Sequence, residues 1–426
     1  MKQIGIAIMG IGTVGGGTYD ILTQNRDLIR RTRGLDLEVR KILDRSKDNV
    51  TARGIDGALA CTDLNEIVSD PGISVVVETM GGVEPARTFI LRALAAGKSV
   101  VTANKELISK HGSELEAAAK KSGAGLYYEA SCVGGVPIIR TLTDSMQANH
   151  ITEILGIING TTNYILTKMS GEGLSYEAAL REAQQLGYAE ADPTADVEGY
   201  DAMYKLSILS SMAFHTCIPY TEIYREGITA ITPADIAVGR ELGYTLKLLA
   251  IGKRNGREIE ARVHPTFVPD EHPLASVSGS FNAVFLKGDF VDDIMLYGRG
   301  AGAHPTGSAI VSDIVTCAER APHHRYSDYD NSGRLEEGIV VKRDFSSRYY
   351  LSFKLMDKPG VLGRITGILG DCGVSIHKAM QHGDADGYAP VVFFTHMTTE
   401  NAVKKALDVI VGLPDVISLD SLIRVL

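Results

Sequence analysis

Short apolar runs alternate with amphipathic segments along the first third of the chain. Five runs are rich in valine, isoleucine and leucine and have the length of a buried strand: residues 3–9, 37–43, 74–78, 99–102 and 125–129. Helical patterns lie between them, most clearly over residues 85–96 and 106–122. Strands that alternate with helices form a parallel sheet with helices on both faces. We therefore expect an α/β fold that begins with a Rossmann-type parallel sheet.

A different order of elements occupies the C-terminal part. A polar stretch over residues 318–347 indicates a connection between domains. The patterns that follow predict a strand, a helix, two strands, a helix and a final strand, the first five over residues 349–356, 361–372, 374–379, 390–396 and 400–411. This βαββαβ order predicts a small α+β domain. In the middle of the chain, residues 151–158 predict a strand, and residues 176–186 and 200–213 predict helices.

Composition narrows the class of protein. A chain of 426 residues with 44% hydrophobic and 22% charged residues is typical of a globular protein of two or three domains. The net charge of −9 argues against nucleic acid or an anionic membrane as partner, and no apolar run is long enough to cross a membrane. The five cysteines are scattered without metal spacing. Since the chain also opens directly into a strand, without a signal-peptide pattern, we expect a cytoplasmic protein.

A glycine-rich turn follows the first strand and precedes a helix. Its residues are Gly10, Gly12, Thr13, Val14 and Gly15, in the spacing GxGxxG. Glycines at these positions allow a tight turn and close approach of a pyrophosphate to the helix N-terminus. The motif alone is weak evidence, and a glycine-rich turn without a ligand is the alternative. The strand before it, and the helix and second strand after it, favour a dinucleotide site.

Charged residues near the cofactor side leave the choice of cofactor open. Asp44, at the end of the second strand, favours NAD, whereas Arg40, Arg45 and Lys47 favour the 2′-phosphate of NADP. We expect NADP, with Arg40 as a contact, although each residue could be a solvated charge. Lys105 follows the strand at residues 99–102, at the sheet edge where ligands bind. A cation at a helix N-terminus opposes the helix dipole, so we expect Lys105 to contact cofactor or substrate.

The segment over residues 183–205, AQQLGYAEADPTADVEGYDAMYK, is the richest in acids. Pro193 and Gly199 make continuous helix improbable until about Tyr200. The helix that follows carries Asp201 and Lys205 on one face, because side chains four apart lie above each other. Such a pair could bind or protonate a polar substrate. It could equally be a structural ion pair beside a solvated acidic loop, and spacing alone leaves both open.

A second glycine-rich loop follows Glu129. Backbone carbonyls turned inward by such a loop, together with a carboxylate, suit a hard cation. Cys132 in this loop could instead be a thiol nucleophile, but no partner histidine lies nearby in the sequence. We therefore treat the Cys132 side chain as structural.

The order of these motifs identifies a family. The acidic segment resembles the signature of homoserine dehydrogenases, and VVETMGG, VTANKELI, EASCVGGVPII, GIINGTTNYIL and GRGAGAHPTGSAIVSDI are similar to segments of that family. The C-terminal region, with its DKPGVLG turn, resembles an ACT domain. The resemblance covers essentially the whole chain. It implies an NAD(P)-binding Rossmann domain over residues 1–130, completed by residues 303–335, a substrate-binding and dimerisation domain of α+β type over residues 131–302, and an ACT regulatory domain over residues 349–426.

The resemblance also implies an activity and the residues that perform it. The reaction is the reversible NAD(P)-dependent interconversion of L-aspartate 4-semialdehyde and L-homoserine, in the biosynthesis of threonine, methionine and isoleucine. Lys205 matches the catalytic proton donor and Asp201 its neighbour in substrate binding. Glu190 matches the acid that binds the substrate amino group. Gly187 matches a glycine beside substrate and cofactor, and Gly302 one beside the cofactor. The remaining acids, Asp192, Asp196 and Glu198, are then expected to be loop architecture.

Two further ligands follow from the resemblance. Glu129, with the backbones of Cys132, Gly134 and Val136, matches a sodium site. Cys132 departs from the family, in which small apolar residues are commoner, but a carbonyl ligand makes its side chain unimportant. ACT domains usually dimerise and bind an amino acid, so threonine is the expected feedback effector and a homodimer or homotetramer the expected assembly. A purely structural oligomerisation domain is the alternative.

Other functions share parts of this pattern. An acylating semialdehyde dehydrogenase would use Cys132 as nucleophile. Another amino-acid-pathway dehydrogenase with an ACT tail, such as a phosphoglycerate dehydrogenase, would share both ends but not the middle segment. A nucleotide- and amino-acid-sensing regulator would use both binding modules, although the acidic charge and the lack of a DNA-binding motif weigh against it.

Overall fold

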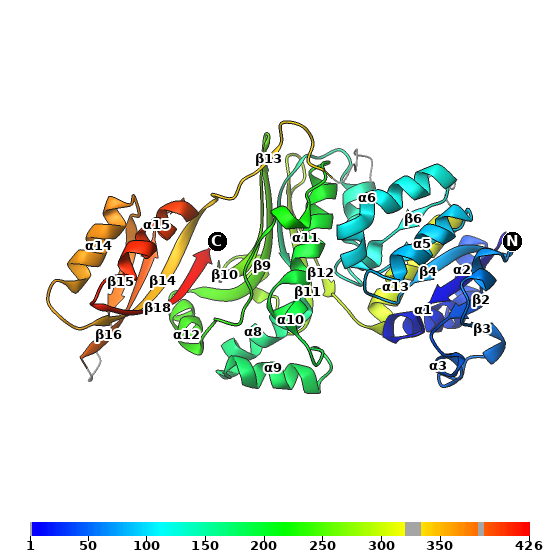
Figure 1. The fold of residues 1–426 in the computed structure, drawn as a ribbon, viewed down its shortest axis with the longest axis horizontal. Helices are drawn as coiled ribbons and strands as arrows, with labels where there is room; N and C mark the ends of the chain where they lie inside the picture. Colours follow the sequence, from blue (N-terminus) through cyan, green and yellow to red (C-terminus); the bar gives the residue numbers. More distant parts are fainter. Residues whose placement is uncertain (1, 320–333, 382–386) are drawn as a thin grey trace.

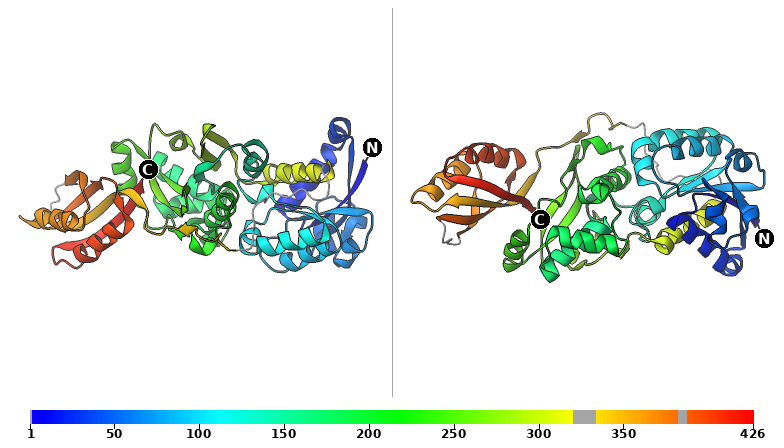
Figure 2. Two further views of the ribbon diagram at one scale, coloured as in Figure 1. Left: turned by 90° about the horizontal axis from the view of Figure 1, so that it is seen from above. Right: turned by 60° about the horizontal axis from the view of Figure 1, so that its bottom comes forward.

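The computed structural model describes residues 2–319, 334–381 and 387–426. Three bodies lie in a row, with the N-terminal domain at one end, the C-terminal domain at the other and the acidic segment in the body between them (Figure 1). The two further views keep this order (Figure 2). In the described ranges no helix is long and apolar enough to cross a membrane.

The N-terminal domain is the expected Rossmann-type sheet. Its six parallel strands have the order β3-β2-β1-β4-β5-β6. The strands are β1 (Lys2–Met9), β2 (Leu35–Leu43), β3 (Ala60–Cys61), β4 (Ile73–Glu78), β5 (Ser99–Thr102) and β6 (Leu126–Tyr127). The helices that connect them are α1 (Thr13–Gln24), α2 (Arg26–Arg33), α3 (Lys47–Thr51), α4 (Asn65–Val68), α5 (Ala86–Ala95) and α6 (Lys105–Ser122). The strand expected over 125–129 is shorter, because the chain turns into a 3₁₀ helix at Glu129–Ser131.

A helix from much later in the chain joins this domain. Helix α13 (Ala303–Glu319) packs against α1, where a side chain on Gly17 would collide with the backbone of Ala303. Lys2 Nζ donates a hydrogen bond to the carbonyl oxygen of Ala318 at 2.8 Å. Residues 303–319 therefore lie on the Rossmann domain. Much of the polar connection expected over 318–347 falls on residues 320–333, outside the described part of the chain.

The middle domain contributes half of a long mixed sheet. The order across that sheet is β12-β11-β7-β9-β10-β18-β14-β16-β15. Its middle-domain strands are β7 (Ile151–Ile157), β9 (Tyr244–Asn255), β10 (Glu258–Pro269), β11 (Phe281–Gly288) and β12 (Asp292–Arg299), while the short strands β8 (Tyr224–Arg225) and β13 (Val340–Val341) pair with β10. The helices of this domain are α7 (Ile138–Arg140), α8 (Gly160–Glu172), α9 (Tyr176–Gln185), α10 (Thr194–Val197), α11 (Tyr200–Ala213) and α12 (Pro233–Glu241).

The C-terminal domain has the predicted βαββαβ order. Its elements are β14 (Ser346–Met356), α14 (Val361–Asp371), β15 (Ile376–Gln381), β16 (Tyr388–Thr395), α15 (Glu400–Ile410) and β18 (Val416–Val425), and the short strand β17 (Thr398–Thr399) pairs with β14. Its own apolar core includes Phe353, Ile365, Phe393 and Val403. The domain can thus bury a core independently of the rest of the chain.

The last strand joins the C-terminal domain to the middle domain. Strand β18 pairs in parallel with β10, with Arg424 opposite Thr266. Arg424 is 1% exposed and forms ion pairs with Glu400, at 2.5 Å, and with Glu226 of the middle domain. Tyr349 donates its hydroxyl hydrogen to Glu400 at 2.9 Å. A buried arginine with two carboxylates therefore bridges the two domains.

Replacing Arg424 with methionine is expected to destabilise this junction by about 3 kcal/mol, because it removes the cation that Glu226 and the buried Glu400 share and leaves Glu400 only the half-exposed Lys404, at 3.3 Å, as a described ion-pair partner. Urea unfolding of the full chain, followed by circular dichroism, measures the loss. Arg343→Met is the matched control, because Arg343 also pairs with a middle-domain acid, Glu222, but its side chain is 72% exposed. A loss no larger for Arg424→Met than for the control would contradict the expected role.

Candidate active site

One buried carboxylate lies at the centre of the site. Asp201 is 5% exposed, and its Oδ2 accepts a hydrogen bond from Lys205 Nζ at 2.6 Å. Its Oδ1 lies 3.2 Å from Lys105 Nζ. Asp201 and Lys205 belong to α11, which begins after Gly199 with a left-handed φ of +80°. Lys105 is the first residue of α6 in the Rossmann domain. Two domains therefore contribute one ammonium group each to the same carboxylate.

Lys205 is held from two sides. Its side chain is almost buried, and Nζ donates a second hydrogen bond to the carbonyl oxygen of Ile158 at 2.8 Å. An ammonium group has three hydrogens, so one remains for a substrate oxygen. By contrast, the Lys105 side chain is 43% exposed, and Asp201 is its ion-pair partner. The more constrained lysine is the one for which the family resemblance implies proton transfer.

Two acids of the cluster have pKa values that are shifted in opposite directions. Burial alone would raise the pKa of Asp201, but Lys205, Lys105 and the hydrogen bond from Asn159 outweigh it and hold that pKa far below its ordinary value. Asp201 in turn raises the pKa of Lys105, against the effect of burial. Burial and the charge of Asp201 raise the pKa of Asp196. Asp201 is thus the permanent anion, and Asp196 the acid that resists ionisation.

Two members of the cluster were not expected from the sequence. Asn159 Nδ2 donates to Asp201 Oδ2 at 2.8 Å and to Asp196 Oδ1 at 2.7 Å, so one amide joins both acids. Its Oδ1 accepts from Thr162 N at 2.8 Å and caps α8. The sequence signal was an asparagine at the start of a helix, which also suits an ordinary cap. Asp196, expected to be loop architecture, lies in the site.

Asp192 and Glu198 make the local contacts that were expected of loop residues. Asp192 accepts hydrogen bonds from the backbone and hydroxyl of Thr194. Glu198 lies near Arg225, with 3.8 Å between charged atoms. Glu190, expected to bind the substrate amino group, is exposed on the loop after α9, and its charge adds to the raised pKa of Lys105 after that of Asp201.

A cavity of about 450 Å³ lies at the carboxyl ends of the Rossmann strands. Its lining includes Gly10, Gly12, Asp44 and Arg45. A smaller cavity of about 190 Å³ is lined by Val14 and Lys105 among others and leads toward the ion-pair cluster. These positions match the expectation for a dinucleotide and its reacting end.

The glycine-rich turn has the required backbone. Gly10 has a φ of +94°, and a side chain on Gly15 would collide with the Gly10 carbonyl. Thr13 begins α1. Gly187 and Gly302, both with positive φ, lie after α9 and before α13, and neither lines the two cavities formed by described residues.

Arg40 is placed away from the cofactor cavity. It projects from within β2 and pairs with Asp70, at 3.3 Å, near the amino end of β4. Arg45, two residues beyond the end of β2, lines the cavity instead. Asp44 Oδ2 accepts a hydrogen bond from Ile11 N in the glycine turn at 3.0 Å. Strand direction explains the difference, because only residues at the carboxyl end of β2 reach the ligand side.

The glycine-rich loop after Glu129 places a buried carboxyl group beside several backbone carbonyls. Glu129 is 2% exposed, and its two oxygens accept hydrogen bonds from Ile139 N at 2.9 Å and Arg140 N at 2.7 Å. Burial and the nearby Asp313 raise the pKa of Glu129 to about 8. Among the described residues, no hydrogen bond reaches the carbonyl oxygens of Cys132 or Gly134.

The carbonyl of Val136 differs, because it accepts from Ile138 N at 2.8 Å. No cluster of three or more histidine, cysteine or acidic side chains forms a metal site in the described ranges. A cation here would therefore depend on backbone carbonyls and one carboxylate, a donor set that suits sodium.

The Cys132 thiol is placed unfavourably for nucleophilic chemistry. It is fully buried and contacts the Lys205 carbonyl oxygen at 3.9 Å. Burial raises its pKa to about 12, so the thiolate form is suppressed. This argues against the acylating alternative.

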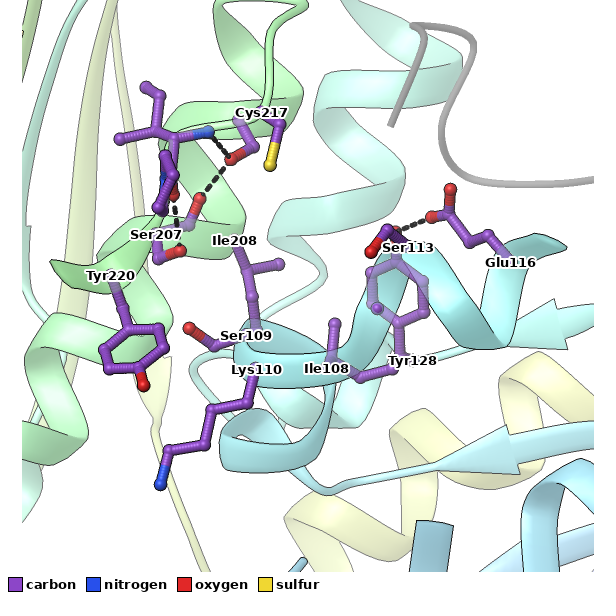
Figure 3. A pocket seen from close by; sticks show the side chains of 14 residues that line it. Ile108, Ser109, Lys110, Ser113, Glu116, Tyr128, Ser207, Ile208, Cys217 and Tyr220 are labelled. Atoms are coloured by element: carbon purple, nitrogen blue, oxygen red, sulfur yellow. Dashed lines mark hydrogen bonds between the residues drawn. The ribbon is translucent and has the colours of Figure 1, made fainter. Parts of the chain in front are cut away.

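A third cavity, of about 210 Å³, separates later turns of α6 and α11 (Figure 3). Ser109 and Ser113 line it from α6, and Ser207 and Ile208 from α11. Ser207 donates to the Ile218 carbonyl oxygen at 2.7 Å. Successive helical residues are about 100° apart, so Ser207 points roughly 200° away from Lys205. The two helices therefore touch at the Lys105–Asp201 pair and again where Lys110 lies over the Tyr204 ring, 5.2 Å from its centroid, with the cavity beside these contacts.

Comparisons with known proteins agree with this geometry. Residues 137–315 match the family described as homoserine dehydrogenase, residues 10–129 its NAD-binding domain, and residues 349–415 the ACT domain. A homoserine dehydrogenase of Synechocystis is 41% identical over 442 residues, which covers 99% of both chains, and one of Bacillus subtilis is 39% identical and covers 94% of this chain and 93% of its own.

Solved structures give the same result. A homoserine dehydrogenase from Thiobacillus denitrificans superposes with a TM-score of 0.93 at 40% identity, covering 100% of this chain and 99% of its own. A hyperthermophilic archaeal homoserine dehydrogenase in complex with NADPH has a TM-score of 0.63 at 28% identity, covering 74% of this chain and 98% of its own. With a Rossmann domain, a buried Asp–Lys cluster and an ACT domain in one chain, the protein belongs to the homoserine dehydrogenase family of oxidoreductases.

Proposed function

We propose that the chain catalyses the reversible NADP-dependent reduction of L-aspartate 4-semialdehyde to L-homoserine, with Lys205 as proton donor. The observation that carries this proposal is the Asp201 carboxylate bound by Lys205 and Lys105 where the substrate and cofactor domains meet. When bound, the cofactor supplies the hydride to the aldehyde carbon. Lys205 Nζ then gives a proton to the oxygen that becomes the hydroxyl, and Asp201 keeps the ammonium group oriented.

The substrate is a zwitterion, and the site offers charges of both signs. Glu190, exposed on the loop after α9, carries the negative charge that suits the substrate ammonium. Lys105 has a more exposed ammonium than Lys205, so we assign it to the negative groups of substrate or cofactor. Asp201 positions both lysines because its carboxylate binds both ammonium groups. Asn159 in turn fixes that carboxylate through a hydrogen bond.

NADP is favoured over NAD by one residue. Arg45 lines the cofactor cavity, and no acid lies within 4 Å of its guanidinium in the described part of the chain. An unpaired arginine beside the ribose end suits a 2′-phosphate. Asp44 is already hydrogen-bonded to the glycine turn and to Asn49, so its carboxylate serves the loop.

Replacing Lys205 with alanine should lower kcat for homoserine oxidation by about 10²–10⁴-fold, since the general acid–base group is removed. Steady-state kinetics with NADP and with NAD measure the loss and the cofactor preference together. Lys342→Ala, which removes the exposed ion pair between Lys342 and Glu258, is the control and should keep wild-type activity.

The pH profile gives a second readout of the same variant. In the oxidative direction Lys205 must accept a proton from the substrate hydroxyl, so the wild-type rate should rise as the pH rises. The Lys205→Ala enzyme should lack this rise. Retention of full activity, or of the same rise with pH, would exclude Lys205 as the proton-transfer group.

We further propose a sodium site formed by Glu129 and the carbonyl oxygens of Cys132, Gly134 and Val136. The support is a buried carboxyl group with a raised pKa and two buried carbonyls without a described hydrogen-bond donor. A monovalent cation would favour the ionised carboxylate and complete the coordination of those oxygens. The cation would serve to fix the loop that precedes α7, beside the Lys205 backbone.

This proposal predicts a cation effect that depends on pH. Sodium must displace the proton of Glu129, so its affinity should fall as pH decreases below about 8. At equal ionic strength, Tm should therefore be higher in NaCl than in choline chloride, and this difference in Tm should be larger at pH 8.5 than at pH 6. Glu129→Gln should abolish the difference, whereas Cys132→Ala should keep it, because only the carbonyl of Cys132 is used. Equal Tm values in both salts at pH 8.5 would refute the site.

We also propose that the ACT domain transmits threonine inhibition to the active site. Arg424 binds Glu226, and the following residues contact the acidic segment, since Ile228 N donates to the Val197 carbonyl oxygen at 2.8 Å. Val197 is the last residue of α10, which carries Asp196. A movement of the ACT sheet could therefore be transmitted to the Asp201 cluster through a few covalent and hydrogen-bonded links.

Threonine is expected to inhibit homoserine oxidation by the wild-type chain. In Glu226→Gln it should still bind but inhibit less, because the charge contact with Arg424 is weakened. Binding is followed by the rise in Tm with threonine, and inhibition by initial rates. Glu258→Gln, an exposed ion-pair acid on β10, is the control. No inhibition of the wild type, with no rise in Tm, would leave the ACT domain as an oligomerisation module.

A further inference from the structure

A cavity of about 460 Å³ lies in the middle domain at its border with the ACT domain. Helices α8 and α12, the start of β9 and the segment after β10 form its wall. In Figure 1, α12 lies between α8 and the C-terminal sheet. The ring of Tyr244, which lines the cavity, stacks on Phe394 of the ACT domain with 5.9 Å between centroids. This cavity is separate from the Asp201 cluster and shares no lining residue with the cofactor cavities.

The wall contains a buried cation without a counter-ion. Lys247 is 3% exposed, and no carboxylate among the described residues lies within 4 Å of its ammonium. Its Nζ donates to the Val277 carbonyl oxygen at 2.5 Å and is 3.5 Å from Asn163 Oδ1. Neutral carbonyl groups compensate a buried charge poorly, and burial lowers the pKa of Lys247 to about 8.

Other groups on the wall point to the same kind of ligand. Arg240 of α12 also lines the cavity, is exposed, and has no carboxylate partner within the described ranges. The buried hydroxyl oxygen of Ser170 lines it too and has no hydrogen-bond partner. Among the described residues that line the cavity, Asp270 is the one acid, and it accepts a hydrogen bond from the Thr245 hydroxyl at 2.7 Å. The lining therefore carries two cations and one acid, an excess of positive charge.

We propose that this cavity is a second ligand site, which binds a small carboxylate-bearing molecule through Arg240 and Lys247. Arginine binds a carboxylate through paired N–H groups, and a buried lysine adds a charge that water does not screen. The Ser170 hydroxyl supplies a further donor. If the ligand is an amino acid, Asp270 would bind its α-ammonium group. Asp270 therefore distinguishes an amino acid from a simple carboxylic acid as the ligand. Ile236, Leu246 and Ala275 supply apolar surface for the rest of the molecule.

The chain itself offers a reporter for this site. It has no tryptophan, so Tyr244→Trp places a single indole on the cavity wall. The full-length Tyr244→Trp protein is titrated at constant ionic strength with propionate, L-alanine and propionamide. Propionamide has the same shape as propionate without the charge, and L-alanine adds an ammonium group. A saturable fluorescence change is expected with propionate or L-alanine and not with propionamide.

Variants in the reporter protein test the assigned residues. Arg240→Gln should weaken binding at least tenfold, the loss typical of one charge-assisted hydrogen bond. Arg240 is chosen over Lys247 because an exposed side chain can change without disturbing the fold. Arg257→Gln, at the far end of the β9–β10 hairpin, is the matched control and should change the affinity less than twofold. If the site is built for amino acids, Asp270→Asn should weaken the binding of L-alanine but not of propionate. If it is built for simple carboxylic acids, Asp270→Asn should weaken the binding of neither.

Three outcomes would overturn the proposal. The first is the absence of saturable binding by both carboxylates. The second is an equal response to propionamide, which would show that charge is not recognised. The third is unchanged affinity in Arg240→Gln, which would place the binding elsewhere. None of these outcomes bears on the Lys205 mechanism, because the test measures binding and not turnover.

Discussion

The arrangement of the Rossmann and middle domains depends on one buried carboxylate that needs cationic partners. Asp201 is buried, and a buried anion without partners is strongly unfavourable. Its partners come from two domains, Lys205 from the same helix and Lys105 from the Rossmann domain. Moving the domains apart would leave the anion with a single ammonium partner. The charge arrangement of this cluster and the relative position of the domains are therefore the same physical constraint, and the cavity in Figure 3 lies beside the contact.

A second constraint links the ACT domain to the same centre. Strand β10 pairs with β9 on one side and with β18 on the other, so one sheet runs from the middle domain into the C-terminal domain. The Arg424 cluster lies where the two parts join and includes Glu226, whose neighbours contact the acidic segment. The cavity lined by Lys247 also borders the ACT domain, through the contact of Tyr244 with Phe394. Buried charges thus concentrate at both places where domains meet.

The spacing of apolar residues predicted most elements, because a helix and a strand each require their own period of apolar positions. Strand β5 and helix α11 have the bounds that their apolar patterns predicted. Strand β6 is shorter than expected because Glu129 N hydrogen-bonds to Asp313, 184 residues away, and the chain leaves the sheet to do so. Strand β3, with two residues, was not predicted, since a run that short has no period to detect.

What the sequence determined by itself is local. The glycine turn, the placement of Asp201 and Lys205 on one helical face and the βαββαβ order follow from spacing, because backbone geometry fixes neighbours three to five residues apart. Packing decided the rest. It brought Lys105 onto Asp201, used Asn159 to join Asp196 to the cluster, and turned Arg45 rather than Arg40 toward the cofactor cavity. These contacts join elements that are distant in the chain, and their distances depend on how buried apolar faces fit together, which spacing does not specify.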